Sequence, residues 1–159
     1  MGTKTRNIFE GKVRVRVCGI VVRDSKILMV NIKSPTRENS FWMPPGGGVE
    51  FSESLETALK REMLEETGLK VNSSRLLYIS EYLKGGWHAI EFYFLCDNYE
   101  GEAKLGNDPE LNDAEQMIKE LKWFSAEEAA TAELFPGFIE KDFQQLLKGE
   151  IIGPLFVRQ

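Results

Sequence analysis

The sequence predicts an α+β fold in the form of an α/β/α sandwich around a mixed β-sheet. Strand-like segments, either apolar or alternating, lie both before and after one amphipathic central helix. Further helical segments follow near the end of the chain. Since no linker, repeat or low-complexity segment divides the chain, its 159 residues are interpreted as a single domain, with residues 1–11 as a flexible arm.

Composition restricts the class of protein. A hydrophobic content of 42% and a charged content of 28% are typical of soluble globular proteins. The net charge of −5 argues against binding to polymeric nucleic acid, and no apolar run has the length of a membrane span. Cys18 and Cys96 lie in apolar strand-like segments, so we expect buried free thiols and a cytoplasmic location.

The first part of the chain predicts a hairpin. Residues 12–23 alternate valine with polar residues and then become wholly apolar, which is typical of a strand that enters the interior. Residues 26–32 form a second strand after a short turn, so the two strands are expected to pair. Further along, Pro44 and Pro45 fix the backbone direction before three glycines, which allow a ligand to approach the backbone closely.

The central helix is predicted to begin after Ser52, whose hydroxyl group can cap it, and to end at Gly68 in the left-handed conformation. Leu55, Ala58 and Leu59 have the spacing of a face turned to the core. The stripe that these residues define continues through positions 62, 63 and 66, and two of these three positions are glutamates.

Three glutamates therefore lie on or beside the apolar face of this helix: Glu62, Glu65 and Glu66. An acidic run is usually a solvated helix face. Here, however, partial burial of like charges would be unfavourable unless a cation lay among them. Carboxylates beside a glycine loop supply the hard oxygen ligands that suit Mg²⁺ or Mn²⁺, so the cluster is interpreted as a metal site.

The second half of the chain predicts more strands and then helices. Residues 71–84 and 88–97 are expected to form a second hairpin, and residues 118–124 a further strand. Short helices are expected over residues 126–134, capped by Ser125, and over residues 138–148. The apolar tail after them is expected to pack on the domain or on a partner chain. The oligomeric state stays open, and a homodimer is compatible with the sequence.

Residues Gly47 to Leu69 resemble the complete sequence box of the Nudix hydrolase family. The shared identities, at the spacing of that family, are Gly47, Glu53, Arg61, Glu62, Glu65, Glu66 and Gly68. Seven identities at fixed spacing are far more specific than an isolated glycine motif. The resemblance implies an α/β/α sandwich and the hydrolysis of a diphosphate linked to another group, often a nucleoside, with Mg²⁺ or Mn²⁺ as cofactor.

The resemblance also implies roles for single residues. Glu62, Glu65 and Glu66 would be the carboxylate ligands of the metal ion. The carbonyl oxygen of Gly46 would be a further ligand. Arg61 and Glu53 would pair and hold the glutamates in place.

The general base stays open at this point. Glu62, Glu115 and Glu120 are the candidates, because the position of the base varies within the family. A metal-activated water loses its proton to a carboxylate within reach, whichever residue supplies it.

Substrate contacts are predicted for Arg16 on the first strand and for the aromatic residues Trp42 and Trp87. Arg16 would bind a phosphate and the tryptophans would stack on a base, whereas an exposed strand face and core packing are the alternatives. Candidate substrates are nucleoside di- and triphosphates, nucleotide sugars and dinucleoside polyphosphates.

Two alternatives to an active hydrolase stay open: a non-catalytic Nudix-like module that binds a nucleotide and regulates another protein, and a structural protein with a solubilising acidic face. The intact set of glutamates favours the hydrolase.

Overall fold

The computed structural model describes residues 11–33, 39–106 and 117–159. The strands are β1 (Val13–Ile20), β2 (Val22–Arg23), β3 (Lys26–Lys33), β4 (Ser40–Met43), β5 (Gly46–Gly48), β6 (Lys70–Lys84), β7 (Trp87–Glu100), β8 (Ile118–Phe124) and β9 (Leu155–Arg158). The helices are α1 (Leu55–Thr67), α2 (Ala126–Ala129), α3 (Gly137–Lys141) and α4 (Phe143–Lys148).

The strands form two sheets. The larger has the order β5-β1-β7-β6-β9, with parallel pairing of β1 to β7 and of β6 to β9. The smaller contains β2, β3, β4 and β8, with β3 at its centre. Because the larger sheet combines parallel and antiparallel pairs, the predicted mixed sheet is confirmed.

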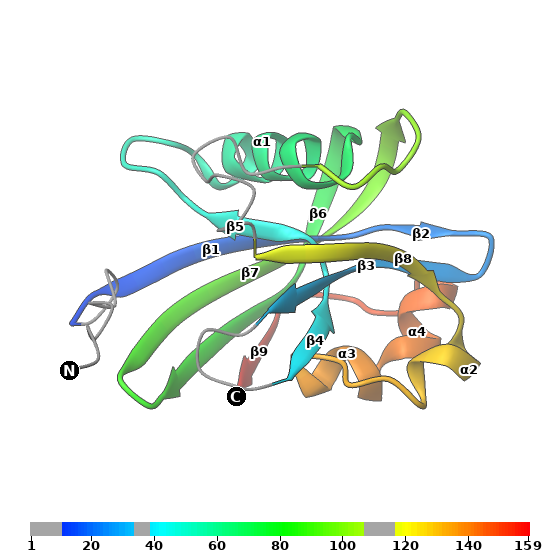
Figure 1. Ribbon diagram of the computed structural model, residues 1–159. Coiled ribbons are helices and arrows are strands. Elements are labelled where there is room, and N and C mark those ends of the chain that lie inside the picture. The colour runs from blue at the N-terminus through cyan, green and yellow to red at the C-terminus, as the bar shows by residue number, and fades with distance from the viewer. Residues whose placement is uncertain (1–10, 34–38, 107–116) are drawn as a thin grey trace.

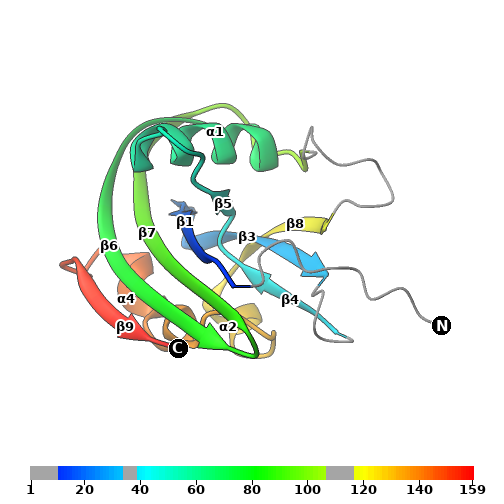
Figure 2. The ribbon, with the colours of Figure 1, turned by 90° about the vertical axis from the view of Figure 1, so that its left-hand side faces the viewer.

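Helices cover the sheets from opposite sides. Helix α1 lies on one side, and α2, α3 and α4 lie on the other (Figure 1). The long strands β6 and β7 curve from the side of α1 toward the short helices, and β9 runs along the outside of β6 (Figure 2). This arrangement confirms the predicted α/β/α sandwich.

Apolar side chains form a core on each side of the larger sheet. Ala58, Leu59 and Met63 of α1 are fully buried against Val17 and neighbouring residues of the sheet. The second core lies on the side of α3 and α4, and its buried members include Cys18, Tyr78, Tyr93 and Ile139. The stripe read from the sequence of α1 is therefore the face that packs on the sheet.

The predicted pairing of residues 12–23 with residues 26–32 is wrong for most of its length. Only Val22 and Arg23 of β2 pair with β3. The strand β1 pairs with β5 and β7 in the other sheet, because the chain passes from one sheet to the other at Val21. The glycines, which were expected to form a loop, are themselves a strand, β5, which continues the larger sheet beside β1.

The last third of the chain differs from expectation at two places. The helix expected over residues 126–134 ends at Ala129, because the segment that follows it runs along β4. There the amide of Trp42 donates to the carbonyl of Glu133 (2.9 Å), and the carbonyl of Trp42 accepts from the amide of Phe135 (2.8 Å). The helix expected over residues 138–148 is divided at Asp142, whose carboxylate accepts a hydrogen bond from the hydroxyl of Tyr78.

The apolar tail packs on the domain, which was one of the two alternatives that the sequence left open. It forms β9, which pairs in parallel with residues 78–81 of β6. Across the described ranges, no helix combines the length and the hydrophobicity that a membrane span requires.

Candidate active site

Helix α1 positions the candidate site and is fixed at both ends. Ser54, not Ser52, is its N-cap, and the Ser54 hydroxyl accepts from the amide of Thr57 (3.1 Å). Ser52 instead lies in the preceding turn with a positive φ of 66°, which is incompatible with a cap conformation. Gly68 ends the helix in the left-handed conformation and donates to the carbonyl of Leu64, as predicted.

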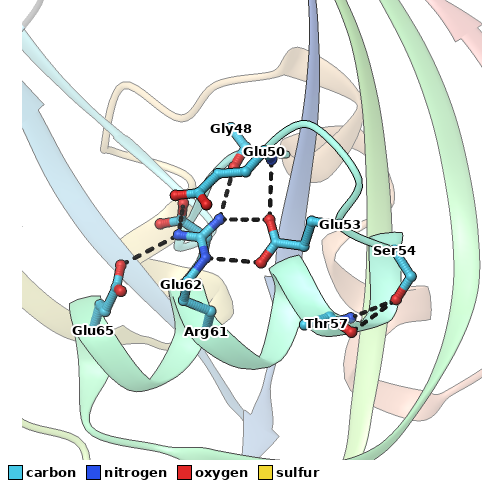
Figure 3. Close-up of polar contacts among 8 residues, drawn as sticks. All are labelled: Gly48, Glu50, Glu53, Ser54, Thr57, Arg61, Glu62 and Glu65. Carbon is cyan, nitrogen blue, oxygen red and sulfur yellow. Dashed lines mark hydrogen bonds and ion pairs between the residues drawn. The ribbon is translucent and has the colours of Figure 1, made fainter.

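Arg61 lies at the centre of the site (Figure 3). Its Nε and Nη2 atoms donate to the two carboxylate oxygens of Glu53, both at 2.9 Å. Nη2 also donates to the carbonyl of Gly48 at 3.0 Å. Nη1 donates to Glu62 at 2.8 Å and reaches Glu65 at 3.4 Å. One guanidinium group therefore connects the glycine strand, the loop before α1 and two of the glutamates.

Glu53 is fixed from two directions. Besides Arg61, the amide of Glu50 donates to it at 3.0 Å. The hydrogen bonds from Arg61 are the main reason why the pKa of Glu53 is lowered to about 2. The same hydrogen bonds raise the pKa of Arg61. The pair is therefore fully charged at neutral pH.

The glycine strand touches the carboxylates of Glu62 and Glu66. The amide of Gly46 donates to Oε2 of Glu66 at 2.8 Å. A Cβ atom at Gly47 would lie 2.5 Å from the carboxyl group of Glu62. Only glycine at position 47 leaves room for this carboxylate, which explains the first identity of the sequence box in steric terms.

The three glutamates are half-buried, as their position beside the apolar face predicts. The side chain of Glu62 is 13% exposed and that of Glu65 is 30% exposed. Burial raises the pKa of Glu62, and Arg61 opposes this effect. Within the described residues, no three carboxylate, histidine or cysteine side chains lie close enough together to hold a metal ion. Arg61 is the cation that contacts Glu62 and Glu65 in this arrangement.

The candidates for the general base lie in different places. Glu62 is at the centre of the site. Glu115 lies outside the described residues. Glu120 is exposed on β8, opposite Asn31 of β3.

The predicted substrate contacts also lie apart from one another. Arg16 pairs with Glu91 of β7, and its neighbour on the other side is Gly48 of β5, so it lies next to the glycine strand. Trp42 packs against Phe124, with 4.8 Å between ring centroids. Trp87 begins β7 at the tip of the β6–β7 hairpin, four residues before Glu91.

Sequence reasoning did not identify Glu91. It is a single glutamate in the apolar segment of residues 88–97, and one acid without a motif carries no spacing signal. Only the register of β7 against β1 brings it to Arg16. A hollow of about 280 Å³ lies next to Gly149, and one of about 410 Å³ is lined by Lys60, Arg61 and Leu64 of α1.

The fold and the arginine-linked carboxylates next to a glycine strand define a hydrolase of the Nudix type. A model of the NUDIX domain matches residues 12–142. The chain therefore belongs to the Nudix hydrolase family.

Two related proteins and one solved structure show how similar this chain is to other members of the family. An ADP-ribose pyrophosphatase of Methanocaldococcus jannaschii is 37% identical over 125 residues, which cover 69% of this chain and 73% of that protein. An 8-oxo-dGTP diphosphatase of Buchnera aphidicola is 33% identical over 78 residues, or 49% of this chain and 58% of that protein. The crystal structure of a MutT NUDIX hydrolase from Burkholderia pseudomallei matches with a TM-score of 0.68 and 25% identity, covering 89% of this chain and 99% of that one.

Proposed function

We propose that this Nudix hydrolase cleaves the diphosphate bond of a nucleoside diphosphate linked to another group, with Mg²⁺ or Mn²⁺ as cofactor and water as the attacking group. The bond that forms joins a water oxygen to one phosphorus atom, and the bond that breaks is the bridging P–O bond. The proton of the water passes to a carboxylate, and the products are two phosphate monoesters.

Arg61 provides the main support for this proposal, because it fixes charged groups that are costly to bring together. It is held at two points by Glu53 and contacts Glu62 and Glu65 through Nη1. A catalytic group must be held within a fraction of an ångström of its working position, and rigid neighbours provide this. A surface ion pair with no such purpose would contribute little.

The residues present fit a divalent cation in the chemistry of their donors. The carboxylates of Glu62, Glu65 and Glu66 and the carbonyl of Gly46 are hard oxygen ligands, as Mg²⁺ and Mn²⁺ prefer. The contact between the Gly46 amide and Glu66 places this glycine directly beside one of these carboxylates. The Glu65 contact with Arg61 is the longest in the cluster, so Glu65 is the carboxylate most easily released to a metal ion.

A bound divalent ion would offset negative charge on the phosphate oxygens and lower the pKa of a bound water. The residues of the chain would supply the remaining functions. Arg61 and Glu53 would hold helix α1 in a fixed position relative to the glycine strand β5. Glu62, which contacts Arg61 at the centre of the site, is our first choice as the proton acceptor, ahead of Glu115 and Glu120. Trp42 and Trp87 remain proposed contacts for the nucleoside.

ADP-ribose is the substrate that we propose to test first. The relative from Methanocaldococcus jannaschii is named an ADP-ribose pyrophosphatase, and this chain aligns with 73% of its length. ADP-ribose also has the general form proposed above, a nucleoside diphosphate joined to a second group. We place the reaction in the cytoplasm, because Cys18 and Cys96 are both buried free thiols.

A panel of substrates tests the proposal. ADP-ribose, 8-oxo-dGTP, a nucleotide sugar and a dinucleoside polyphosphate would be incubated with wild type and with Glu65→Gln, with Mg²⁺ or Mn²⁺. Products would be separated by chromatography. We expect wild type to cleave a diphosphate bond in at least one compound, so that each half of that compound leaves with its own phosphate, and Glu65→Gln to do so much more slowly. If all compounds stay intact with both metals, the proposal is wrong.

A further inference from the structure

A buried ion pair lies next to the glycine strand, outside the Nudix box. Nη1 of Arg16 contacts Oε1 of Glu91 at 2.6 Å. The Glu91 side chain is only 3% exposed and the Arg16 side chain 16%. Their residues are direct partners in the parallel register of β1 and β7. A carboxylate at this depth is strongly unfavourable unless several donors surround it.

Glu91 obtains those donors from its own strand, β7, and from the residue that follows β9. Its Oε2 atom accepts from the hydroxyl of Tyr93 at 3.1 Å and from Nε2 of Gln159 at 3.0 Å. Nε2 of Gln159 also contacts the hydroxyl of Ser80. The backbone amide of Gln159 donates to the carbonyl of Glu81 at 3.0 Å, which fixes this residue beside β6 at the end of β9. Glu91 therefore cannot turn without breaking several hydrogen bonds.

Arg16 uses only one side of its guanidinium group in this network. Nη1 is engaged with Glu91, whereas Nε is buried and has no hydrogen-bond partner among the described residues. The Nε side of an arginine matches the oxygens of phosphate in geometry. Across the ladder from Arg16 is Gly48, whose carbonyl accepts from Arg61. The unused donor thus lies one strand away from the candidate active site.

We propose that Gln159 is a positioning residue of the substrate site. Together with Tyr93 it fixes Glu91, and Glu91 holds Arg16 so that its Nε side binds a phosphate oxygen of the substrate. This inference rests on the proposed function, because it assumes a substrate with phosphate groups. It extends the site to β9, which lies beyond residues 12–142 of the family match.

A purely structural role is the alternative: the network would then only hold β1, β7 and β9 together. The two roles differ in what Gln159→Ala does to ligand binding. Inorganic diphosphate is a suitable probe, and calorimetry in EDTA measures its binding without metal ions and without turnover. Arg158→Ala is the matched control, because Arg158 is the neighbouring residue, its side chain is 82% exposed and its ion pair is with Glu81, outside the Glu91 network.

We expect Gln159→Ala to weaken diphosphate binding roughly three- to tenfold, the value of a hydrogen bond of this kind. Arg158→Ala should stay within about twofold of wild type. Arg16→Lys, which keeps the charge but loses the planar fork, should weaken binding at least as much as Gln159→Ala. Adding Gln159→Ala to Arg16→Lys should have little further effect, because the two residues act through one network.

Kinetics add a second measurement on any substrate that the panel identifies. Gln159→Ala should raise KM and leave kcat within about twofold of wild type, since it alters binding and not the reacting groups. If Gln159→Ala lowers the melting temperature strongly, Tyr93→Phe decides, because it removes the other donor to Glu91 and leaves β9 intact.

The inference is overturned if wild type does not bind diphosphate, or if Gln159→Ala and Tyr93→Phe both bind it as wild type does. These results are independent of turnover, which is measured separately by the substrate panel. A chain that hydrolyses a substrate but shows no effect of Gln159→Ala would retain the proposed function and lose this inference.

Discussion

Arg61 and Glu53 form a two-point ion pair in which Nε and Nη2 each lie 2.9 Å from one carboxylate oxygen. The residues are eight positions apart, on either side of the start of α1. The pair therefore joins the loop before the helix to the turn that carries Glu62 and Glu65. Its geometry requires the planar fork of arginine and not only a positive charge.

Arg61→Lys tests the importance of this fork. Lysine keeps the charge but cannot make the paired contacts with Glu53 and the contact with Glu62 together. We expect kcat/KM to fall about 10- to 100-fold, as for other residues that orient ligands. Steady-state kinetics on the substrate identified by the panel measures this. Lys60→Ala is the control, since Lys60 forms an ion pair with Glu56 on the exposed side of α1. Equal activity of Arg61→Lys and wild type would contradict the role given to Arg61.

Glu53→Gln should change how stability depends on pH. The pKa of Glu53 is lowered from 4.5 to about 2 in the folded state. The ion pair therefore stabilises the fold fully above a pH of 4.5, and this contribution is lost as the pH falls toward 2. The free energy of unfolding of wild type should exceed that of Glu53→Gln at neutral pH, and the difference should shrink in acid.

Urea unfolding across the acid range measures this difference. Glu127→Gln is the control, because Glu127 is exposed on α2 and its side chain forms no hydrogen bond or ion pair within the described part of the chain. A difference between wild type and Glu53→Gln that stays constant in acid would show that the ion pair does not lower the pKa of Glu53.

Gly47→Ala tests the steric account of the glycine strand. The added methyl group would lie 2.5 Å from the carboxyl group of Glu62, so this side chain must move. We expect a loss of about 1–3 kcal/mol in the free energy of unfolding and a large loss of activity. Gly137→Ala is the matched control, since no atom lies within 4 Å of its added Cβ and it begins α3. Unchanged activity in Gly47→Ala would mean that the position of Glu62 is not critical.

Metal binding should be visible without any substrate. A cation that binds only the folded chain must raise the melting temperature, and the increase depends on its concentration. We expect millimolar Mg²⁺ or Mn²⁺ to raise the melting temperature of wild type and to have a smaller effect on Glu66→Gln. Calorimetry with and without EDTA measures this. Identical shifts in the two proteins would place the ion elsewhere.

Local patterns predicted several features of the fold correctly. The strand over residues 118–124, the end of α1 at Gly68 and the capping of α2 by Ser125 follow from signals within a few residues. Ser52 and Ser54 could not be distinguished by sequence, because both are serines that precede the same apolar stripe. The conformation of the turn decides between them.

Pairing between distant segments was not predictable in the same way. β1 was expected to pair with the next strand, but its partners are β5 and β7. The box pattern led to Arg61 and its glutamates, because fixed spacing on one helix brings them together. Glu91 reaches Arg16, and Gln159 reaches Glu91, only through the register of β1, β7, β6 and β9. No spacing in the sequence reveals that register.

The most direct test of the central claim is the rate of ADP-ribose hydrolysis by wild type, Glu62→Gln, Glu65→Gln and Glu66→Gln in saturating Mg²⁺. Glu127→Gln again serves as the control for loss of a surface charge. We predict that wild type and Glu127→Gln release AMP at similar rates and that each of the other variants is slower by at least about 10-fold. Release of AMP by all three glutamine variants at the wild-type rate would contradict the assignment of these glutamates to the active site.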